Sequence, residues 1–218
     1  LWSKQWKVVP FMYCTSPHSS FPAPTSSHPN SLSICFVGSL DRRKNVGCLL
    51  RAAEILKTRS VRLHVDIVGD GPLREALVSQ ASSICSEIVE IRFLGALPMR
   101  KTQIIIASND VLVLPSLHDG WGAVVNEALT QGLFAVCSDK CGAKDLLLDA
   151  RRGKVFANDN ANSLKAILEE AAENKDNLRA DKSYRRNWTL NHVNGKSIAS
   201  YLVDCITSNC NVPCPWKQ

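Results

Sequence analysis

From residue 33 onward, short apolar runs alternate with segments whose apolar residues recur at helical spacing. The runs that we predict to be strands are residues 33–37, 63–68, 90–94, 110–114 and 133–138. Each intervening segment has one apolar face that can pack on a sheet. Strands that alternate with helices are typical of parallel sheets. The pattern therefore predicts an α/β fold built on a doubly wound parallel sheet.

The two ends of the chain have different patterns. Residues 1–31 combine an apolar stretch at 6–11 with a serine- and proline-rich segment, and we interpret them as the remnant of an N-terminal domain and its linker. Residues 32–207 form the predicted α/β domain, which ends in helices alone, and residues 208–218 are predicted to be an irregular tail anchored by Trp216. The chain starts at Leu1, and we expect it to be a truncated chain.

Charge and cysteine content narrow the class of protein. The net charge of +6 comes from separate basic clusters rather than one stripe, which favours small phosphate-bearing ligands over nucleic acid. No apolar run reaches the roughly 20 residues of a membrane span. Nine cysteines, an odd number, do not form a disulfide framework, and their C-x3-C pairs lack the histidines of a zinc finger. We expect a cytoplasmic protein and predict no metal site.

Glycines and basic residues follow the predicted strands, where ligands of parallel sheets bind. Gly38 closes the first strand and precedes Arg42-Arg43-Lys44, while Gly69-Asp70-Gly71-Pro72 closes the second. Each signal is weak by itself. The basic run is equally typical of a solvated residue cluster at the start of a helix. Gly69 and Gly71 lack the third glycine of a dinucleotide-binding fingerprint, and they are equally typical of a turn.

Two carboxylates stand eight residues apart after the fourth predicted strand, at Asp119 and Glu127. Gly120 and Gly122 flank Trp121 between them and let backbone N–H groups approach a ligand closely. A helix that begins there adds positive dipole character suited to phosphate. One carboxylate could then bind a sugar and the other a ribose. The alternative for Asp119 is that it caps the following helix.

Taken together, the motifs occur in the order found in one family. They are Phe36-Val37-Gly38-Ser39-Leu40-Asp41-Arg42-Arg43-Lys44-Asn45, Val68-Gly69-Asp70-Gly71-Pro72, Phe93-Leu94-Gly95, Val113-Leu114-Pro115-Ser116 and Asp119-Gly-Trp-Gly-Ala-Val-Val-Asn-Glu127. The chain resembles, from about residue 33 to 206, the C-terminal half of retaining glycosyltransferases of the GT4 type, the glycosyl transferases group 1. That resemblance implies one half of a GT-B fold, a Rossmann-like domain that binds the nucleotide-sugar donor.

The resemblance also implies site residues. The expected catalytic residues are Asp119, Glu127 and Lys44, with Lys44 on the donor diphosphate, Glu127 on the ribose and Asp119 beside the transferred sugar. The expected donor-binding residues are Gly38, Arg43, Lys44, Gly69, Phe93, Leu94, Asp119, Gly120, Trp121, Gly122, Ala123, Val124, Val125 and Glu127. Phe93 and Leu94 would flank the base. His118 is interpreted as a loop histidine rather than a proton carrier.

Two positions depart from the family pattern. Ser39 stands where the family usually has arginine, so the second cationic contact with the diphosphate would fall to Arg42 or Arg43. Asp119 stands where the family generally has glutamate, one methylene longer. The eight-residue spacing to Glu127 is kept, and a ligand contact is the role that the neighbouring motifs favour.

The implied function is transfer of a sugar from a UDP- or GDP-linked donor to an acceptor with retention of configuration, without a cofactor. The acceptor, a sugar, a lipid-linked molecule or another compound, would be bound by an N-terminal domain missing from this chain, so the fragment alone is expected to be inactive. The resemblance also allows peripheral contact of the protein with a membrane. The alternative is a non-catalytic nucleotide-sugar-binding or interaction module, because a fold alone does not decide the function.

Overall fold

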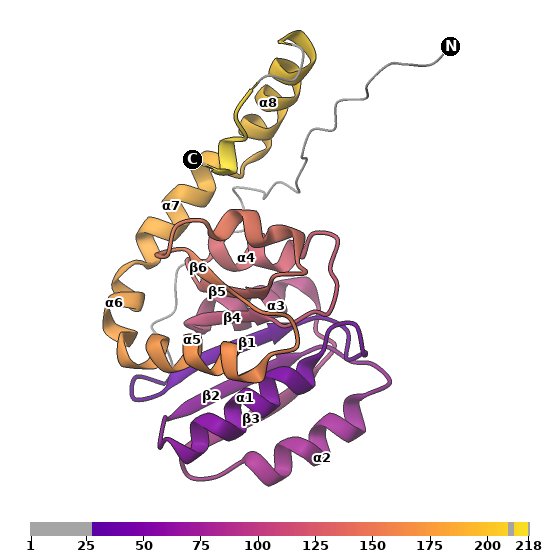
Figure 1. Cartoon of the computed structure of the whole chain (residues 1–218), viewed down its shortest axis with the longest axis vertical. Coiled ribbons are helices and arrows are strands. Elements are labelled where there is room, and N and C mark those ends of the chain that lie inside the picture. Colours follow the sequence, from indigo (N-terminus) through magenta and orange to yellow (C-terminus); the bar gives the residue numbers. More distant parts are fainter. Residues whose placement is uncertain (1–27, 209–211, 218) are drawn as a thin grey trace.

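A six-stranded parallel sheet forms the centre of the molecule (Figure 1). The computed structural model describes residues 28–208 and 212–217. The strands are β1 (Leu32–Val37), β2 (Leu63–Val68), β3 (Val89–Gly95), β4 (Val111–Leu114), β5 (Phe134–Ser138) and β6 (Gly153–Phe156). Their order in the sheet is β3-β2-β1-β4-β5-β6. The predicted Rossmann-like, doubly wound parallel sheet is therefore confirmed.

Helices cover both faces of this sheet. They are α1 (Val46–Thr58), α2 (Arg74–Ile84), α3 (Met99–Ser108), α4 (Ala123–Thr130), α5 (Ala161–Glu173), α6 (Lys175–Ala180), α7 (Lys182–His192) and α8 (Gly195–Thr207). On one face α1 packs against α2 and α5, and on the other α4 packs against α3 and α7. This division follows from right-handed crossovers on the two sides of a sheet that is wound in both directions from its centre.

The central strands are buried on both faces. All residues of β2, β4 and β5 are buried, which explains why β4 and β5 are nearly continuous apolar runs, whereas β2 also buries His64 and Asp66 between its apolar residues. All five predicted strands are present, with bounds that differ from the prediction by at most one residue.

Four of these helices and strands, β6, α3, α6 and α7, were not predicted from the sequence. Strand β6 has only four residues, of which Lys154 and Val155 are partly or fully exposed, so no apolar run marks it. Helix α3 was missed as well. Helix α7 is mostly polar, and the buried residues that hold it are Arg185, Trp188 and Thr189. The Arg185 guanidinium donates to the carbonyl oxygens of Gly132 and Arg151, so hydrogen bonds rather than an apolar stripe fix this helix.

The segment before β1 is fastened to the C-terminal helices. The guanidinium of Arg179, in α6, donates to the carbonyl oxygens of His28, Pro29 and Ser31 at 3.0–3.1 Å. The same side chain makes two hydrogen bonds to the Asp110 carboxylate, at 3.0 and 2.8 Å. Asp110 has a fully buried side chain at the start of β4, so one arginine joins the beginnings of two neighbouring strands.

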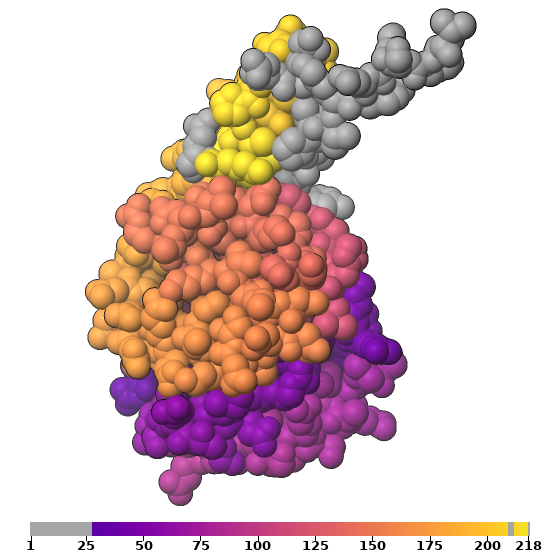
Figure 2. Space-filling model, viewed as in Figure 1, coloured from indigo at the N-terminus to yellow at the C-terminus, as the bar shows by residue number. Residues whose placement is uncertain are grey.

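Helix α8 projects from the body, as the yellow region of the space-filling view shows (Figure 2). The 3₁₀ turn η3 (Pro215–Lys217) returns along it and buries Trp216 completely, with its ring edge-on to Tyr201. The predicted anchoring role of Trp216 is thus confirmed. Lys217 also pairs with Asp145 in the 3₁₀ turn η2 (Gly142–Leu147), at 3.0 Å.

The predicted strand at residues 6–11 and most of the predicted linker lie outside the described residues. Among the helices of the described part, none combines the length and the apolar character that crossing a membrane requires.

Candidate functional site

The loops that follow β1 and β4 meet at the middle of the sheet. From β1 the chain continues to β2 and β3 on one side, and from β4 to β5 and β6 on the other. This reversal of strand order is the switch point at which open parallel sheets bind ligands. The backbone N–H of Leu117 donates to the carbonyl oxygen of Arg43 at 2.8 Å, which holds the two loops together.

Lys44 and Asp119 form an ion pair across these loops. The Nζ atom of Lys44 lies 2.6 Å from Oδ2 of Asp119, and the two side chains are only 14% and 12% exposed. The sequence predicted that both residues belong to one site, and the structure brings them into contact. A cation and a carboxylate are therefore available side by side at the switch point.

A short network shapes the turn that carries Lys44. The Asp41 carboxylate accepts from the Ser39 hydroxyl at 2.7 Å and from the backbone N–H of Lys44 at 2.9 Å. The Ser39 hydroxyl is the main reason why the pKa of Asp41 lies below its usual value. Ser39, at the position where the resemblance led us to expect arginine, thus organises the loop, and the sequence did not single out Asp41 as a site residue.

Arg43 supplies the second positive charge near Asp119. Its Nη1 atom lies 3.8 Å from Oδ2 of Asp119 and donates to the carbonyl oxygen of His118 at 3.5 Å. Arg42 is exposed and makes no hydrogen bond or ion pair with the described residues. Of the two arginines proposed from the sequence, Arg43 is the one in position.

The loop at residues 119–122 is held by the segment that follows β5. Asp119 N–H donates to the carbonyl of Lys140, and the Asp119 carbonyl accepts from Gly142 N–H, both at 3.1 Å. The Trp121 carbonyl accepts from the N–H of Ala143 at 2.7 Å. These three hydrogen bonds fix the backbone of the loop beside Asp119.

Gly122 is the point at which this loop becomes a helix. It has φ of +88°, in the left-handed region, and a Cβ atom there would lie 2.6 Å from Cδ2 of Leu114 and 2.7 Å from Sγ of Cys141. Glycine is therefore required both by conformation and by space. The N–H of Val125 donates to the Gly122 carbonyl at 2.9 Å. The N–H groups of Gly122, Ala123 and Val124 are left without an acceptor among the described residues, which suits an anion.

Glu127 lies in the second turn of α4. It is half-buried, and burial raises the pKa of its carboxyl group. No hydrogen bond or ion pair engages this carboxylate within the described residues. A desolvated acid without a partner of its own is well suited to accept hydrogen bonds from a ligand.

The loops after β1 and β2 touch through their glycines. A Cβ atom on Gly69, which has φ of +139°, would lie 1.8 Å from the carbonyl oxygen of Gly38. Phe93 and Leu94 lie on β3, two strands from β1, half-buried and not in contact with Lys44. With strands about 4.8 Å apart, these side chains are roughly 10 Å from the Lys44 loop across the sheet. An elongated ligand could reach both places.

Trp121 faces its own helix. Its indole N–H donates to the amide oxygen of the buried Asn126 at 2.9 Å. Gly120, by contrast, has nothing within 4 Å of the position of an added Cβ. Trp121 therefore braces the loop against α4, while Gly120 leaves open space beside it.

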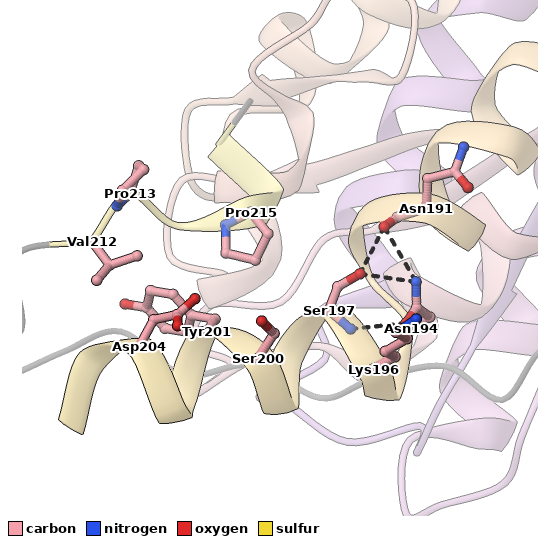
Figure 3. A pocket seen from close by; sticks show the side chains of 10 residues that line it. All are labelled: Asn191, Asn194, Lys196, Ser197, Ser200, Tyr201, Asp204, Val212, Pro213 and Pro215. Atoms are coloured by element: carbon pink, nitrogen blue, oxygen red, sulfur yellow. Dashed lines mark hydrogen bonds between the residues drawn. The ribbon is translucent and has the colours of Figure 1, made fainter. Parts of the chain in front are cut away.

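Two pockets lie away from these loops. One, of about 560 Å³, lies between α8 and the returning segment 212–215, where polar side chains such as Asn194 and Ser197 line it (Figure 3). The other lies beside β5, α5 and α6 and includes Arg151 and Arg185. Neither contains a predicted site residue, and the chemistry at the switch point is the better guide to the ligand.

A comparison with protein families matches the profile described as "Glycosyl transferases group 1" to residues 21–188. The chain belongs to this family. A relative in Campylobacter jejuni, N-acetylgalactosamine-N,N'-diacetylbacillosaminyl-diphospho-undecaprenol 4-alpha-N-acetylgalactosaminyltransferase, is 32% identical over 157 residues, which are 67% of this chain and 41% of the relative. The chain spans between 27% and 42% of the length of the first curated relatives that it matches.

Solved glycosyltransferases of the family's fold superpose on this chain. Sucrose-phosphate synthase from Thermosynechococcus elongatus gives a TM-score of 0.74 at 19% identity and covers 90% of this chain and 51% of its own. HepE from Anabaena, solved in complex with UDP and glucose, gives 0.67 at 17% identity, with 84% and 50% covered. At these identities the likeness shows the fold, which is that of GT-B glycosyltransferases.

Proposed function

We propose that this group 1 glycosyltransferase chain is the C-terminal, donor-binding half of a retaining enzyme of the GT4 type, with a UDP- or GDP-linked sugar as donor. The observation that carries the proposal is the convergence at the switch point. The Lys44–Asp119 pair lies there beside the helix start at Gly122, and Glu127 follows it in α4.

Each part of a nucleotide sugar has a matching group. The diphosphate is bound by Lys44 and by the N–H groups that begin α4, with Arg43 close enough to add a second cation. The ribose hydroxyls donate to Glu127, and Asp119 accepts from the sugar. Phe93 and Leu94, two strands away on β3, flank the base. The complex of HepE with UDP and glucose supports a donor of this kind.

Retention follows from the proposed family type. The cations and the helix dipole stabilise the negative charge that develops on the leaving diphosphate. The acceptor and the opposite wall of the active site belong to an N-terminal domain, so this chain alone binds donor without turning it over. Free thiols at Cys35, Cys48 and the other described cysteines agree with a reducing compartment, the cytoplasm.

Calorimetric titration of the purified chain with UDP, GDP and ADP tests the proposal. We expect one of the three to bind with a stoichiometry of one and to compete with its own sugar-linked form. If the chain is folded, as judged by circular dichroism, and binds none of the three nucleotides, the proposed donor-binding role is refuted.

Two variants separate the carboxylates. Glu127→Ala removes the ribose contact and should weaken binding of the free nucleoside diphosphate and of the nucleotide sugar alike. Asp119→Ala should weaken only the nucleotide sugar, because its carboxylate faces the transferred sugar. Equal losses for both ligands in both variants would contradict the two roles.

A further inference from the structure

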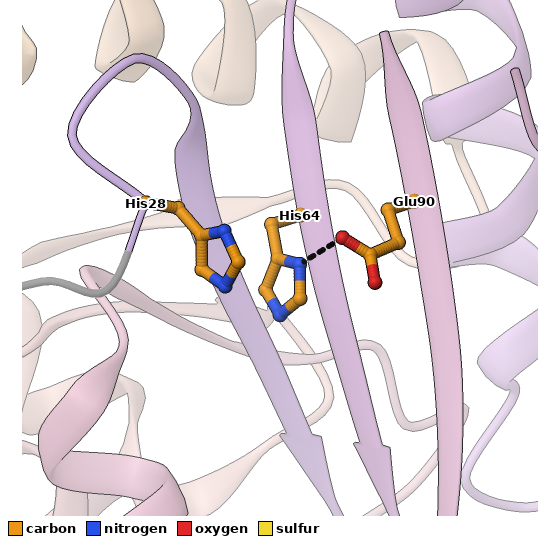
Figure 4. Close-up of side chains that lie close together, drawn as sticks. All are labelled: His28, His64 and Glu90. Carbon is orange, nitrogen blue, oxygen red and sulfur yellow. Dashed lines mark hydrogen bonds and ion pairs between the residues drawn. The ribbon is translucent and has the colours of Figure 1, made fainter. Parts of the chain in front are cut away.

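Two imidazoles and a carboxylate, those of His28, His64 and Glu90, lie together at the amino ends of β2 and β3, away from the switch point (Figure 4). We propose that these three side chains bind a divalent transition-metal ion, best matched by Zn²⁺. His64 is the second residue of β2, and Glu90 is its register partner on β3. His28 comes from the segment before β1. One nitrogen or oxygen from each residue lies within 4.8 Å of the others.

The spacing of His64 and Glu90 already fits two ligands of one ion. Nδ1 of His64 lies 3.0 Å from Oε2 of Glu90. Zinc binds imidazole nitrogen and carboxylate oxygen at about 2.0–2.2 Å in a roughly tetrahedral arrangement, which sets the two ligand atoms a little over 3 Å apart. The ion would replace the proton between these two atoms: a neutral ring would then carry its single proton on Nε2, whereas an imidazolium would keep the Nε2 proton and release the Nδ1 proton to solvent.

The other nitrogen of His64 has the partner that metal-binding histidines usually have. Nε2 lies 3.2 Å from Oδ1 of Asp66, although it is not aligned for a hydrogen bond in the present geometry. Asp66 is itself held by Arg92 at 2.8 Å and by Asn109 at 3.2 Å. Binding through Nδ1 would fix the proton on Nε2, facing this carboxylate, and a carboxylate behind the histidine raises its strength as a ligand.

The local charge favours a cation. With neutral imidazoles, the two carboxylates and Arg92 leave an excess of one negative charge around a histidine that is 2% exposed. This excess of negative charge favours binding of a dication.

His28 must turn to complete the site. Its ring now stacks on that of His64, with centroids 3.6 Å apart and an angle of 16° between the planes. In that arrangement the lone pairs of the two rings run parallel instead of converging. Arg179 fastens the backbone at His28, Pro29 and Ser31, so the change that the site requires is a rotation of the His28 side chain rather than a movement of its segment. A fourth position would be left for water.

Titration of the whole chain with Zn²⁺, by calorimetry and by competition with a chromophoric chelator, tests the proposal. The Cys85→Ser background removes the one cysteine that is exposed among the described residues. We expect a stoichiometry of one and a rise in the thermal midpoint with Zn²⁺. His28→Ala and Glu90→Gln change positions that are not fully buried, so they should fold, and each should weaken Zn²⁺ binding at least roughly tenfold. Glu87→Gln, an exposed carboxylate just before β3, is the matched control and should bind as the parent does.

Two results would overturn the site. They are Zn²⁺ binding that His28→Ala and Glu90→Gln leave unchanged, and thiolate charge-transfer bands when Co²⁺ replaces Zn²⁺. Nucleoside diphosphate binding should be the same in all these variants, because the cluster lies at the opposite end of the strands from Lys44. The outcome is therefore independent of the proposed donor site.

Discussion

Replacing Lys44 with methionine tests the electrostatics of the proposed donor site. The substitution keeps an unbranched apolar stem in a position that is 14% exposed and removes the ammonium group. A hydrogen bond to a charged partner contributes about 1.5–3 kcal/mol. Lys44 already has Asp119 at 2.6 Å as a counter-ion, so a diphosphate must compete for it and the net gain lies at the low end. A loss of about 1.5–2 kcal/mol corresponds to roughly 10- to 30-fold weaker binding.

The assay is calorimetric titration with the nucleoside diphosphate that the parent chain binds best, at two salt concentrations. Lys44→Met should also flatten the salt dependence, because one screened attraction has been removed. Arg42→Met is the matched control in the same loop. Arg42 is exposed, so its removal should change the dissociation constant less than about threefold. If both variants lost affinity equally, the loop would act only through its total charge, and the role of Lys44 would be refuted.

Three further predictions concern stability. Asp110→Ala leaves the guanidinium of Arg179 and the ammonium of Lys182 without this buried counter-ion, and should lower the free energy of unfolding, measured with urea, by about 3–5 kcal/mol. A loss below about 1 kcal/mol would contradict the packing described. Gly69→Ala should cost about 3 kcal/mol or more because of the overlap with the Gly38 carbonyl, whereas Gly120→Ala, which meets open space, should change stability by less than about 1 kcal/mol. The raised pKa of Glu127 means that the folded chain keeps a proton that the unfolded chain releases, so the free energy of unfolding should fall as pH rises from the ordinary value of 4.5 through the folded pKa. Glu127→Gln should remove this contribution to the pH dependence. Parallel curves of stability against pH for parent and variant would contradict the role of Glu127.

The sequence determined the fold well because the central strands are buried on both sides. Such strands are mostly apolar, as β4 and β5 are, and their runs are visible without any knowledge of the partners. In β2 the buried His64 and Asp66 interrupt the apolar residues, which still mark the strand. Strand β6 lies at an edge of the sheet and is partly exposed, so it leaves no such run. Helix α7 depends on hydrogen bonds from the buried Arg185 to carbonyl oxygens, which no periodicity reveals.

The candidate site was predictable to the level of loops. Lys44 and Asp119 both follow parallel strands, so the sequence already places them at one edge of the sheet. Their direct pairing depends on β1 and β4 being neighbours in the sheet. The role of Asp41 in shaping the Lys44 turn was missed because an aspartate in a loop has no distinctive spacing. The meeting of His28 with His64 depends on how the chain approaches β1, which local sequence does not encode.

The clamp made by Arg179 has a consequence for the chain as it is synthesised. Ser31 and Arg179 are 148 positions apart, so at about 5–20 residues per second a ribosome needs roughly 7–30 seconds between them. Throughout that interval the strands from β1 to β6 can emerge and pair, while the lead-in to β1 lacks its hydrogen bonds from Arg179. The order of translation thus makes the entrance to the first strand one of the last parts of the domain to be locked.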